Sequence, residues 1–508
     1  MKINQLKAGA VLSYLILGLN NLVGLVYTPY MLRMMGQSEY GLYALVTSVI
    51  AYLTILDLGF GNTIIRYTAK FRAENKSEEL HSMFGMFVTL YMAISLITIL
   101  LGSVLYFNID LIYSKALTTE ELQKVHIMII LLIFNLAFTF PLSIFGSIIT
   151  AYENFVFQRL IRIARIILNT GVMIVLLEMG YRAIGMVVLI TILNLATLLI
   201  NFWYCKVKLK IKIRFKGFDR SLFKELSGYS FFIFLGALVD RLYWSSGQII
   251  LGAVIGTAAI AVFSVAIQLQ QMYSSFSTAI PGVFLPKITA MTTKEHSHQE
   301  ISDLFIKTGR IQFIILAFVL TGFILFGEKF IILWAGPDYK ETYYITLLFF
   351  IPMTIPLIQN IGLTILMARN QIKFRSVLYI IIAAFSVLLQ LLLVKRYGGI
   401  GSAIAICTAL VLGQIIAMNI YYYKRQNIDI PKFWKEIGRM SVSPLITGVI
   451  TYFILQIVEL DNVAKLAAGI VVFSAVYLPL FWITSMNEYE KQLLVKPLQK
   501  VREKVFKR

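Results

Sequence analysis

Charged residues are scarce in this chain of 508 residues, and acidic residues are scarcer than basic ones. Asp, Glu, Lys and Arg together make up 14% of the sequence, with 26 acidic residues against 46 basic ones. A typical soluble domain has about a quarter of its residues charged. The composition therefore excludes a soluble globular protein of this length.

Cysteine and histidine are also rare, with two and four residues. Cys205 and Cys407 lie on separate apolar stretches without metal-site spacing, so the sequence predicts no disulfide framework, no metal site and no bound cofactor. It contains no P-loop, no GxGxxG after a strand and no HExxH. We therefore expect no ATP hydrolysis and no enzyme activity.

The sequence is instead rich in long apolar runs, and 58% of its residues are hydrophobic. Runs of about 20 apolar residues are long enough to cross a bilayer as helices. We expect an all-α polytopic membrane protein with about fourteen transmembrane helices. The predicted spans are 8–32, 40–65, 82–107, 125–151, 160–179, 183–204, 228–251, 257–285, 310–334, 342–368, 374–394, 400–423, 441–458 and 463–484.

The formal net charge of +20 follows a membrane pattern. Lys and Arg gather in the segments on one side of the spans, and such an excess marks the cytoplasmic side. An even number of spans then places both termini in the cytoplasm. Because the charges form short blocks between apolar spans, we expect membrane lipids and no nucleic acid as partners.

Similar short patterns recur 215 to 220 residues apart, which predicts an internal duplication. One example is Tyr181-Arg-Ala-Ile-Gly185, matched by Tyr397-Gly-Gly-Ile-Gly401. The duplication predicts two six-helix lobes around a central cavity, followed by two further helices. The expected parts are an N-terminal lobe at 1–205, a basic cytoplasmic linker at 206–227, a C-terminal lobe at 228–424, two helices at 425–486 and a basic cytoplasmic tail at 487–508.

Asp240 and Arg241 stand near the middle of the seventh span. A charge at the bilayer centre costs about 2.5–3.5 kcal/mol, so such residues usually face protein or water and mark functional sites. At the repeat offset they correspond to Asn20 and Asn21 in the first span. We therefore expect these four residues to face a cleft between the lobes, or otherwise to hold neighbouring helices together.

Other polar residues also interrupt the spans. Gln268 and Gln271 have the spacing of one helical face in the eighth span, and Asp57 precedes two glycines in the second. Arg66, Arg159, Arg162 and Arg165 lie near the expected inner face. Residues 206–216 alternate basic and apolar side chains, which suits an extended strand on lipid headgroups or an ordinary solvated segment.

The segments Gly36-Gln-Ser-Glu-Tyr-Gly-Leu-Tyr43 and Asp57-Leu-Gly-Phe-Gly61, followed by Arg66, carry a family resemblance. With the fourteen-span layout, the chain resembles polysaccharide-transporter (Wzx-type) lipid-linked oligosaccharide flippases. These belong to the multidrug/oligosaccharidyl-lipid/polysaccharide exporter superfamily. The resemblance implies movement of undecaprenyl-diphosphate-linked sugar units from the inner to the outer leaflet of the bacterial cytoplasmic membrane. Polysaccharide polymerases or ligases would then build O-antigen, capsule or another glycan.

On this hypothesis Arg241 binds the pyrophosphate or an acidic sugar, and Arg66, Arg159 and Arg162 attract the headgroup. Asn20, Asn21, Gln268 and Gln271 bind sugar hydroxyls, while Asp57 or Asp240 binds a coupling proton or sodium ion. Two alternatives stay open: a multidrug antiporter of the same superfamily, and a scaffold of a glycan synthesis complex that transports nothing.

Overall fold

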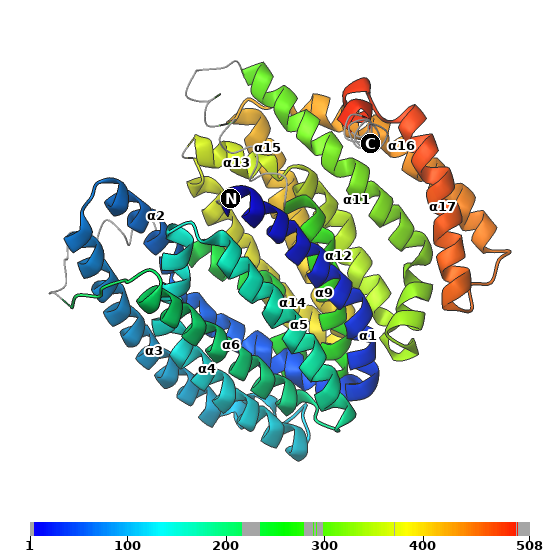
Figure 1. The fold of residues 1–508 in the computed structure, drawn as a ribbon. Coiled ribbons are helices and arrows are strands. Elements are labelled where there is room, and N and C mark those ends of the chain that lie inside the picture. The colour runs from blue at the N-terminus through cyan, green and yellow to red at the C-terminus, as the bar shows by residue number, and fades with distance from the viewer. Residues whose placement is uncertain are drawn as a thin grey trace, which may run out of the picture. The chain divides into compact units, whose positions relative to one another are not determined.

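The computed structural model describes residues 5–215, 234–278, 288, 291, 298–369, 371–493 and 495. In these residues long helices are joined by short turns, and there is no strand (Figure 1). The helices are α1 (Gln5–Leu53), α2 (Phe60–Ala73), α3 (Ser77–Tyr113), α4 (Thr119–Ala151), α5 (Phe155–Glu178), α6 (Ala183–Val207), the helical residues 234–244, α8 (Ser246–Val254), α9 (Thr257–Thr278), α11 (His298–Trp334), α12 (Glu341–Ile358), α13 (Ile361–Ala368), α14 (Lys373–Ala409), α15 (Met418–Lys424), α16 (Ile430–Leu455) and α17 (Val463–Thr484). Short 3-10 helices lie at Thr54–Asp57 and Pro337–Tyr339, and a π-helix at Leu410–Ala417 joins α14 to α15.

Ten helical stretches of the described residues are long and apolar enough to cross a membrane. Two of them contain a break at a glycine: Gly36 in α1 has φ 77°, and Gly398 in α14 has φ 53°. Glycine adopts such positive φ angles at little steric cost, so each break divides one stretch into two crossings. The other two predicted crossings correspond to residues 234–254 and the glutamine-bearing α9, which are not among these ten stretches. The expectation of an all-α polytopic membrane protein is confirmed.

The helices form two compact units, Met1–Val265 with Ala383–Ala405, and Ala266–Ile382 with Ile406–Arg508. These units differ from the expected lobes, because α8, the first turns of α9 and the middle of α14 pack within the first unit. The expected boundaries, including the C-terminal pair of helices, stay a prediction. Most of the expected linker and tail, residues 216–227, 494 and 496–508, lies outside the described residues.

In the first unit, α4 packs between α3 and α6, and α1 packs along α5. Two buried glutamines join its helices. The side chain of Gln248 accepts a hydrogen bond from Ser48 Oγ (2.5 Å) and donates one to Ser264 Oγ (3.0 Å). Gln390 Nε2 of α14 donates to Ser246 Oγ of α8 (3.0 Å). Such bonds between apolar helices hold polar groups that would otherwise be buried without a partner.

The start of α9 is also held in the first unit. The Glu121 carboxylate accepts hydrogen bonds from Ser38 Oγ (2.6 Å) and Thr257 Oγ1 (2.9 Å). Glu121 also completes a capping box with Thr118 at the start of α4. Gly41 of α1 lies so close to Thr257 that a Cβ atom on Gly41 would overlap the Thr257 carbonyl oxygen.

In the second unit, α11 packs against α12, α16 and α17. Arg310 of α11 is almost fully buried and binds Glu490 through Nε (2.6 Å) and Nη2 (3.0 Å). Its Nη1 atom binds Glu436 of α16 (2.7 Å). The Glu490 side chain is only 1% exposed, so this bidentate pair neutralises a buried carboxylate and fixes residues 487–493 against α11.

We predict that Gly41→Ala destabilises the protein by about 1–3 kcal/mol, the usual cost of overpacking. The matched control is Gly18→Ala on the same helix, where nothing lies within 4 Å of an added Cβ. The apparent melting temperatures of the purified variants should fall for Gly41→Ala and stay level or rise for Gly18→Ala. Equal melting temperatures for the two variants would contradict the close α1–α9 contact.

We also predict that Arg310→Met costs about 3–5 kcal/mol, because it leaves the buried Glu490 carboxylate without its cation. The double variant Arg310→Met/Glu490→Leu should recover most of this loss, since an apolar pair can replace a buried ion pair at little cost. Thermal unfolding of the three proteins checks the prediction. A double variant less stable than either single variant would refute it.

Candidate functional site

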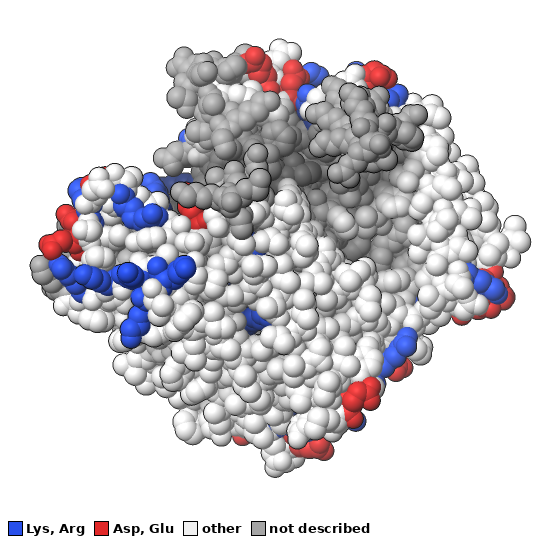
Figure 2. All heavy atoms as spheres, viewed as in Figure 1, with Lys and Arg blue, Asp and Glu red and all other residues white. Residues whose placement is uncertain are grey.

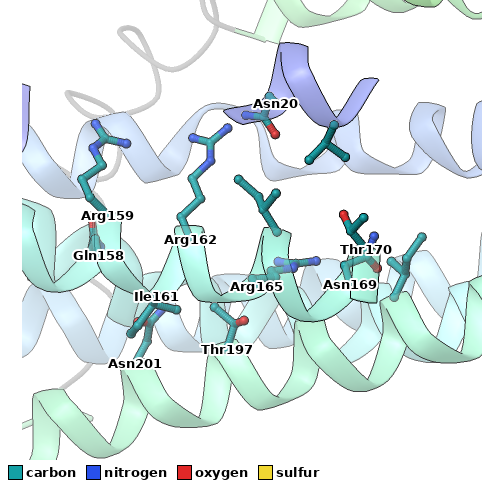
Figure 3. A pocket seen from close by; sticks show the side chains of 13 residues that line it. Asn20, Gln158, Arg159, Ile161, Arg162, Arg165, Asn169, Thr170, Thr197 and Asn201 are labelled. Carbon is teal, nitrogen blue, oxygen red and sulfur yellow. The ribbon is translucent and has the colours of Figure 1, made fainter. Parts of the chain in front are cut away.

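A cavity of about 670 Å³ lies within the first unit, between α1, α5 and α6 (Figure 3). Nine of its thirteen lining residues are polar or basic, and none of them is Asp or Glu. The lining residues are Asn20, Val23, Gln158, Arg159, Ile161, Arg162, Arg165, Ile166, Asn169, Thr170, Ile190, Thr197 and Asn201.

Three arginines of α5 dominate this cavity. Arg159, Arg162 and Arg165 follow one another at intervals of three residues, so each stands about 4.5 Å further along the helix. Figure 3 shows Arg159 and Arg162 extending from α5 in the same direction, with Asn20 of α1 nearby. Arg162 is exposed, and Arg159 and Arg165 are half-buried. We name these three residues the arginine ladder.

The start of α5 is fixed to α4 by a glutamine. Gln158 Nε2 donates to the Gly146 carbonyl (2.5 Å), and Thr150 Oγ1 donates to Gln158 Oε1 (2.7 Å). The residue before Arg159 therefore sets the position of the ladder relative to α4.

Arg165 is held by a chain of amides. Its Nη1 atom donates to Asn194 Oδ1 of α6 (3.1 Å). Asn194 Nδ2 lies within 2.7 Å of both Asn135 Oδ1 and Thr139 Oγ1 of α4. The Asn194 side-chain nitrogen therefore bonds to α4, and this orientation of the amide points the Asn194 Oδ1 atom toward Arg165. This chain of neutral groups orients the guanidinium and leaves its charge uncompensated.

The other two arginines have free donors. Within the described residues, neither Arg159 nor Arg162 has a hydrogen bond or ion pair with another side chain. The buried Oδ1 atom of Asn201 likewise has no hydrogen-bond partner there. A guanidinium presents five N–H donors in a planar fork that matches carboxylate and phosphate oxygens. The cavity therefore suits an anion with several oxygens next to groups that carry hydroxyls.

Of the ten residues expected at a site, the structure brings Asn20, Arg159 and Arg162 together in this cavity. Asn21 is half-buried on the next position of α1 and does not line it. Arg66 of α2 is exposed and lies over the Tyr67 ring, with 5.8 Å between Cζ and the ring centroid. Arg66 is also outside the lining.

Arg241 lies in the helical residues 234–244 and does not line the cavity. Its backbone carbonyl accepts a hydrogen bond from Tyr52 Oη (3.1 Å), and its side chain is half-buried. Asp240 is exposed beside it. Gln268 and Gln271 belong to the second unit, where Gln268 is half-buried and Gln271 exposed.

Asp57 is the last residue of the short 3-10 helix between α1 and α2. Its carboxylate accepts from Tyr91 Oη (2.8 Å) and from the backbone N–H groups of Gly59 and Gly61. These bonds satisfy the free N–H groups at the start of α2. Its observed contacts are those of a helix cap, and its expected part in ion coupling stays a prediction.

Sequence reasoning did not assign a role to Arg165, Gln158, Asn169, Thr170, Thr197 or Asn201, which all line the cavity. The interval of three residues between the arginines was the available signal, because residues three apart share a helix surface. The asparagines on α6 and α4 gave no such signal, since their role depends on which helices pack together.

Comparisons with known proteins agree with this architecture. The family described as "Polysaccharide biosynthesis protein" matches residues 6–292. The lipid II flippase MurJ in an inward closed conformation has a similar fold, with a TM-score of 0.71 at 16% identity over 96% of this chain and 99% of that chain. An inward-facing multidrug resistance MATE transporter of the MOP superfamily has a TM-score of 0.64 at 14% identity, over 82% of this chain and 96% of that chain.

An outward-facing multidrug resistance MATE transporter of the MOP superfamily is a third similar structure, with a TM-score of 0.57 at 13% identity over 85% of this chain and 98% of that chain. No curated protein matches the sequence. At these identities the structures establish a shared fold alone. The family match spans more than half of the chain and includes every residue that lines the cavity. This chain belongs to the polysaccharide biosynthesis protein family.

Proposed function

We propose that this protein is a flippase that moves undecaprenyl-diphosphate-linked oligosaccharides from the inner to the outer leaflet of the bacterial cytoplasmic membrane. Membership of the polysaccharide biosynthesis family and the MurJ-like fold support a carrier of lipid-linked glycans. The observation that carries the proposal is the arginine ladder in a cavity without a carboxylate. The product would supply O-antigen, capsule or another surface polysaccharide.

The ladder suits the diphosphate group of such a lipid. Bidentate contacts between arginine and phosphate are strong, because both partners are charged and the geometry of the fork matches the oxygens. The guanidinium groups of Arg159 and Arg162, which are unpaired among the described residues and extend from one helix in the same direction, can each take one phosphate of a diphosphate. Arg165, one step further along, would hold the group when it moves deeper.

The surroundings of the ladder suit the other parts of the lipid. The α5 residues Leu160, Ile167 and Leu168 are exposed apolar side chains beside the arginines, which allows the polyprenyl chain to stay in an apolar medium. Asn20, Asn169 and Asn201 offer amides to sugar hydroxyls on the cavity side. One site thus offers contacts for tail, diphosphate and sugar.

The orientation of the cavity follows from the charge bias of the loops. If the N-terminus is cytoplasmic, α5 begins at the inner face and Arg159 is the ladder residue nearest to it. The inner-leaflet headgroup would then meet Arg159 and Arg162 before Arg165. Release to the outer leaflet requires alternating access, as expected for carriers built from two repeats.

The remaining expected residues keep their proposed roles. Arg241 would bind an acidic group deeper in the path, Arg66 would attract the headgroup, and Asn21, Gln268 and Gln271 would bind sugar hydroxyls. Asp57 or Asp240 would take a coupling proton or sodium ion. Transport alone breaks no covalent bond in the lipid, so the proposal includes no catalytic residue. Polymerases or ligases would act on the product.

The multidrug antiporter alternative fits the cavity less well. A cationic drug would face three guanidinium groups with no carboxylate among the lining residues to balance them. A scaffold that transports nothing would need no uncompensated cations in a cavity of this size. Both alternatives predict normal arrival of lipid-linked glycans at the outer leaflet when the ladder is neutralised.

We predict that Arg159→Gln/Arg162→Gln weakens substrate binding by about ten- to hundredfold for each lost contact, since a charged hydrogen bond contributes about 1.5–3 kcal/mol. In cells lacking other flippases for this lipid, lipid-linked glycans should accumulate on the inner face. Their accessibility to an externally added glycan-modifying enzyme measures this.

The matched control is Arg182→Gln, which removes an exposed arginine at the N-cap of α6, outside the cavity. It should leave export unchanged, and all variants should be present in the membrane at equal amounts. Normal export by the Arg159→Gln/Arg162→Gln variant would contradict the proposal.

We further predict that Asn194→Leu weakens substrate binding because Arg165 loses the acceptor that orients it. The effect should disappear in an Arg165→Gln background, since residues that act through one contact are not additive. Thr98→Val is the control: Thr98 lies in α3 outside the cavity lining, and its Oγ1 donates to the Ile94 carbonyl of its own helix. Substrate binding by the four combinations of Asn194→Leu and Arg165→Gln checks this, and full additivity would contradict it.

A further inference from the structure

The residues that follow α6 turn at Lys208 and Lys210, continue to Phe215 without regular secondary structure, and are bonded to the first unit at two points. Near α6, the Ile211 amide donates to the Cys205 carbonyl (3.0 Å). At the other end, the Arg214 amide donates to the His81 carbonyl of α3 (3.1 Å), and its guanidinium pairs with Glu78 (2.7 Å). Gly85 of α3 admits this backbone, since a Cβ there would overlap the Arg214 carbonyl oxygen.

Along this fixed backbone, three apolar side chains are half-buried and the basic side chains are exposed. Leu209, Ile211 and Ile213 are half-buried, and the residues between them are exposed. The exposed cations are Lys206, Lys208, Lys210, Lys212 and Arg214. Within the described residues the four lysines form no ion pair, and Arg214 pairs with Glu78. We name these four lysines the lysine comb.

The comb follows the end of α6 and the turn after it. Lys206 lies in the last turn of α6, Lys208 is its C-cap in the right-handed helical region, and Lys210 has a φ of 51°. Figure 2 shows Lys and Arg side chains gathered where Figure 1 places α2 and the start of α3, while the surface along the helices is largely uncharged. The backbone that carries the comb is held in place at Ile211 and Arg214, which lowers the conformational entropy lost on binding.

Apolar side chains at both ends of the comb place it at a membrane surface. Trp203, in the last turns of the membrane-spanning α6, is 61% exposed, and Phe215 is 69% exposed. Val207 is exposed between Lys206 and Lys208. Exposed Trp next to Lys is typical of the interface between lipid tails and headgroups. An acidic soluble protein would not cover Trp203 at the end of a membrane-spanning helix, so these neighbours favour lipid.

We propose that the lysine comb is a binding site for anionic phospholipid headgroups, which anchors the cytoplasmic rim of the first unit to the membrane surface. Each lysine near an anionic surface strengthens binding about fivefold. The four lysines act together because the hydrogen bonds of Ile211 and Arg214 fix the backbone that carries them. This site does not depend on the flippase proposal, since it recognises the charge of bulk lipids.

The test uses the full-length protein purified in a neutral detergent and titrated with phosphatidylglycerol or phosphatidylcholine under native mass spectrometry. The comb variant carries Lys→Gln at positions 206, 208, 210 and 212. It should bind phosphatidylglycerol at least about tenfold more weakly than the wild type and bind phosphatidylcholine equally well. A Lys→Arg variant at the same four positions should retain the wild-type affinity.

The matched control removes four other exposed cations, Lys373, Lys424, Arg425 and Lys435, by substitution with Gln. It has the same net charge as the comb variant and should lose less phosphatidylglycerol affinity, because its four cations are spread over three separate segments. Equal loss in the two variants would show a general charge effect and overturn the proposal. The proposal would also be overturned if the comb variant kept the phosphatidylglycerol affinity of the wild type. Loss of affinity only for a polyglutamate peptide, used as a probe for an acidic protein partner, would be such a result. Melting temperatures equal to that of the wild type confirm that the variants are folded.

Discussion

A guanidinium group in an apolar helix needs polar atoms around it, and α5 carries three such groups within seven residues. Its sequence places Arg159, Arg162 and Arg165 in a candidate membrane span. Each charge would cost about 2.5–3.5 kcal/mol at the centre of a bilayer without compensation. The protein meets this cost with a cavity against α1 and α6 and with amides from α4 and α6. The packing of the first unit around α5 is therefore tied to the charge that α5 carries.

Two sets of polar side chains in the described residues contrast in their surroundings. Gln248, Gln390 and Arg310 are buried and bound to neighbouring side chains, so they hold helices together. Arg159 and Arg162 have no such partner among the described residues and line an open space. Fully satisfied networks stabilise a fold, whereas unsatisfied donors in a cavity remain available for a ligand. This contrast is the physical reason for placing the substrate site at α5.

The sequence predicts the fold class well, because runs of apolar residues and the bias of Lys and Arg are properties of single segments. It also points to Asn20, Arg159 and Arg162, since a polar residue in an apolar helix is conspicuous in isolation. It gives no role to Arg165 or to Asn194, because their function depends on which helices are neighbours. For the same reason, Asp57 looks like an ion site in the sequence, while its bonds to Tyr91 and two backbone amides are those of a helix cap.

The central claim is that the arginine ladder holds the diphosphate of a lipid-linked glycan. The most direct measurement is an experimental structure of the full-length protein in lipid with an undecaprenyl-diphosphate-linked disaccharide bound. The account predicts diphosphate density within hydrogen-bonding distance of the guanidinium groups of Arg159 and Arg162, with the sugars toward Asn20 or Asn201. Diphosphate density at another place, with the ladder cavity empty at saturating ligand, would contradict it.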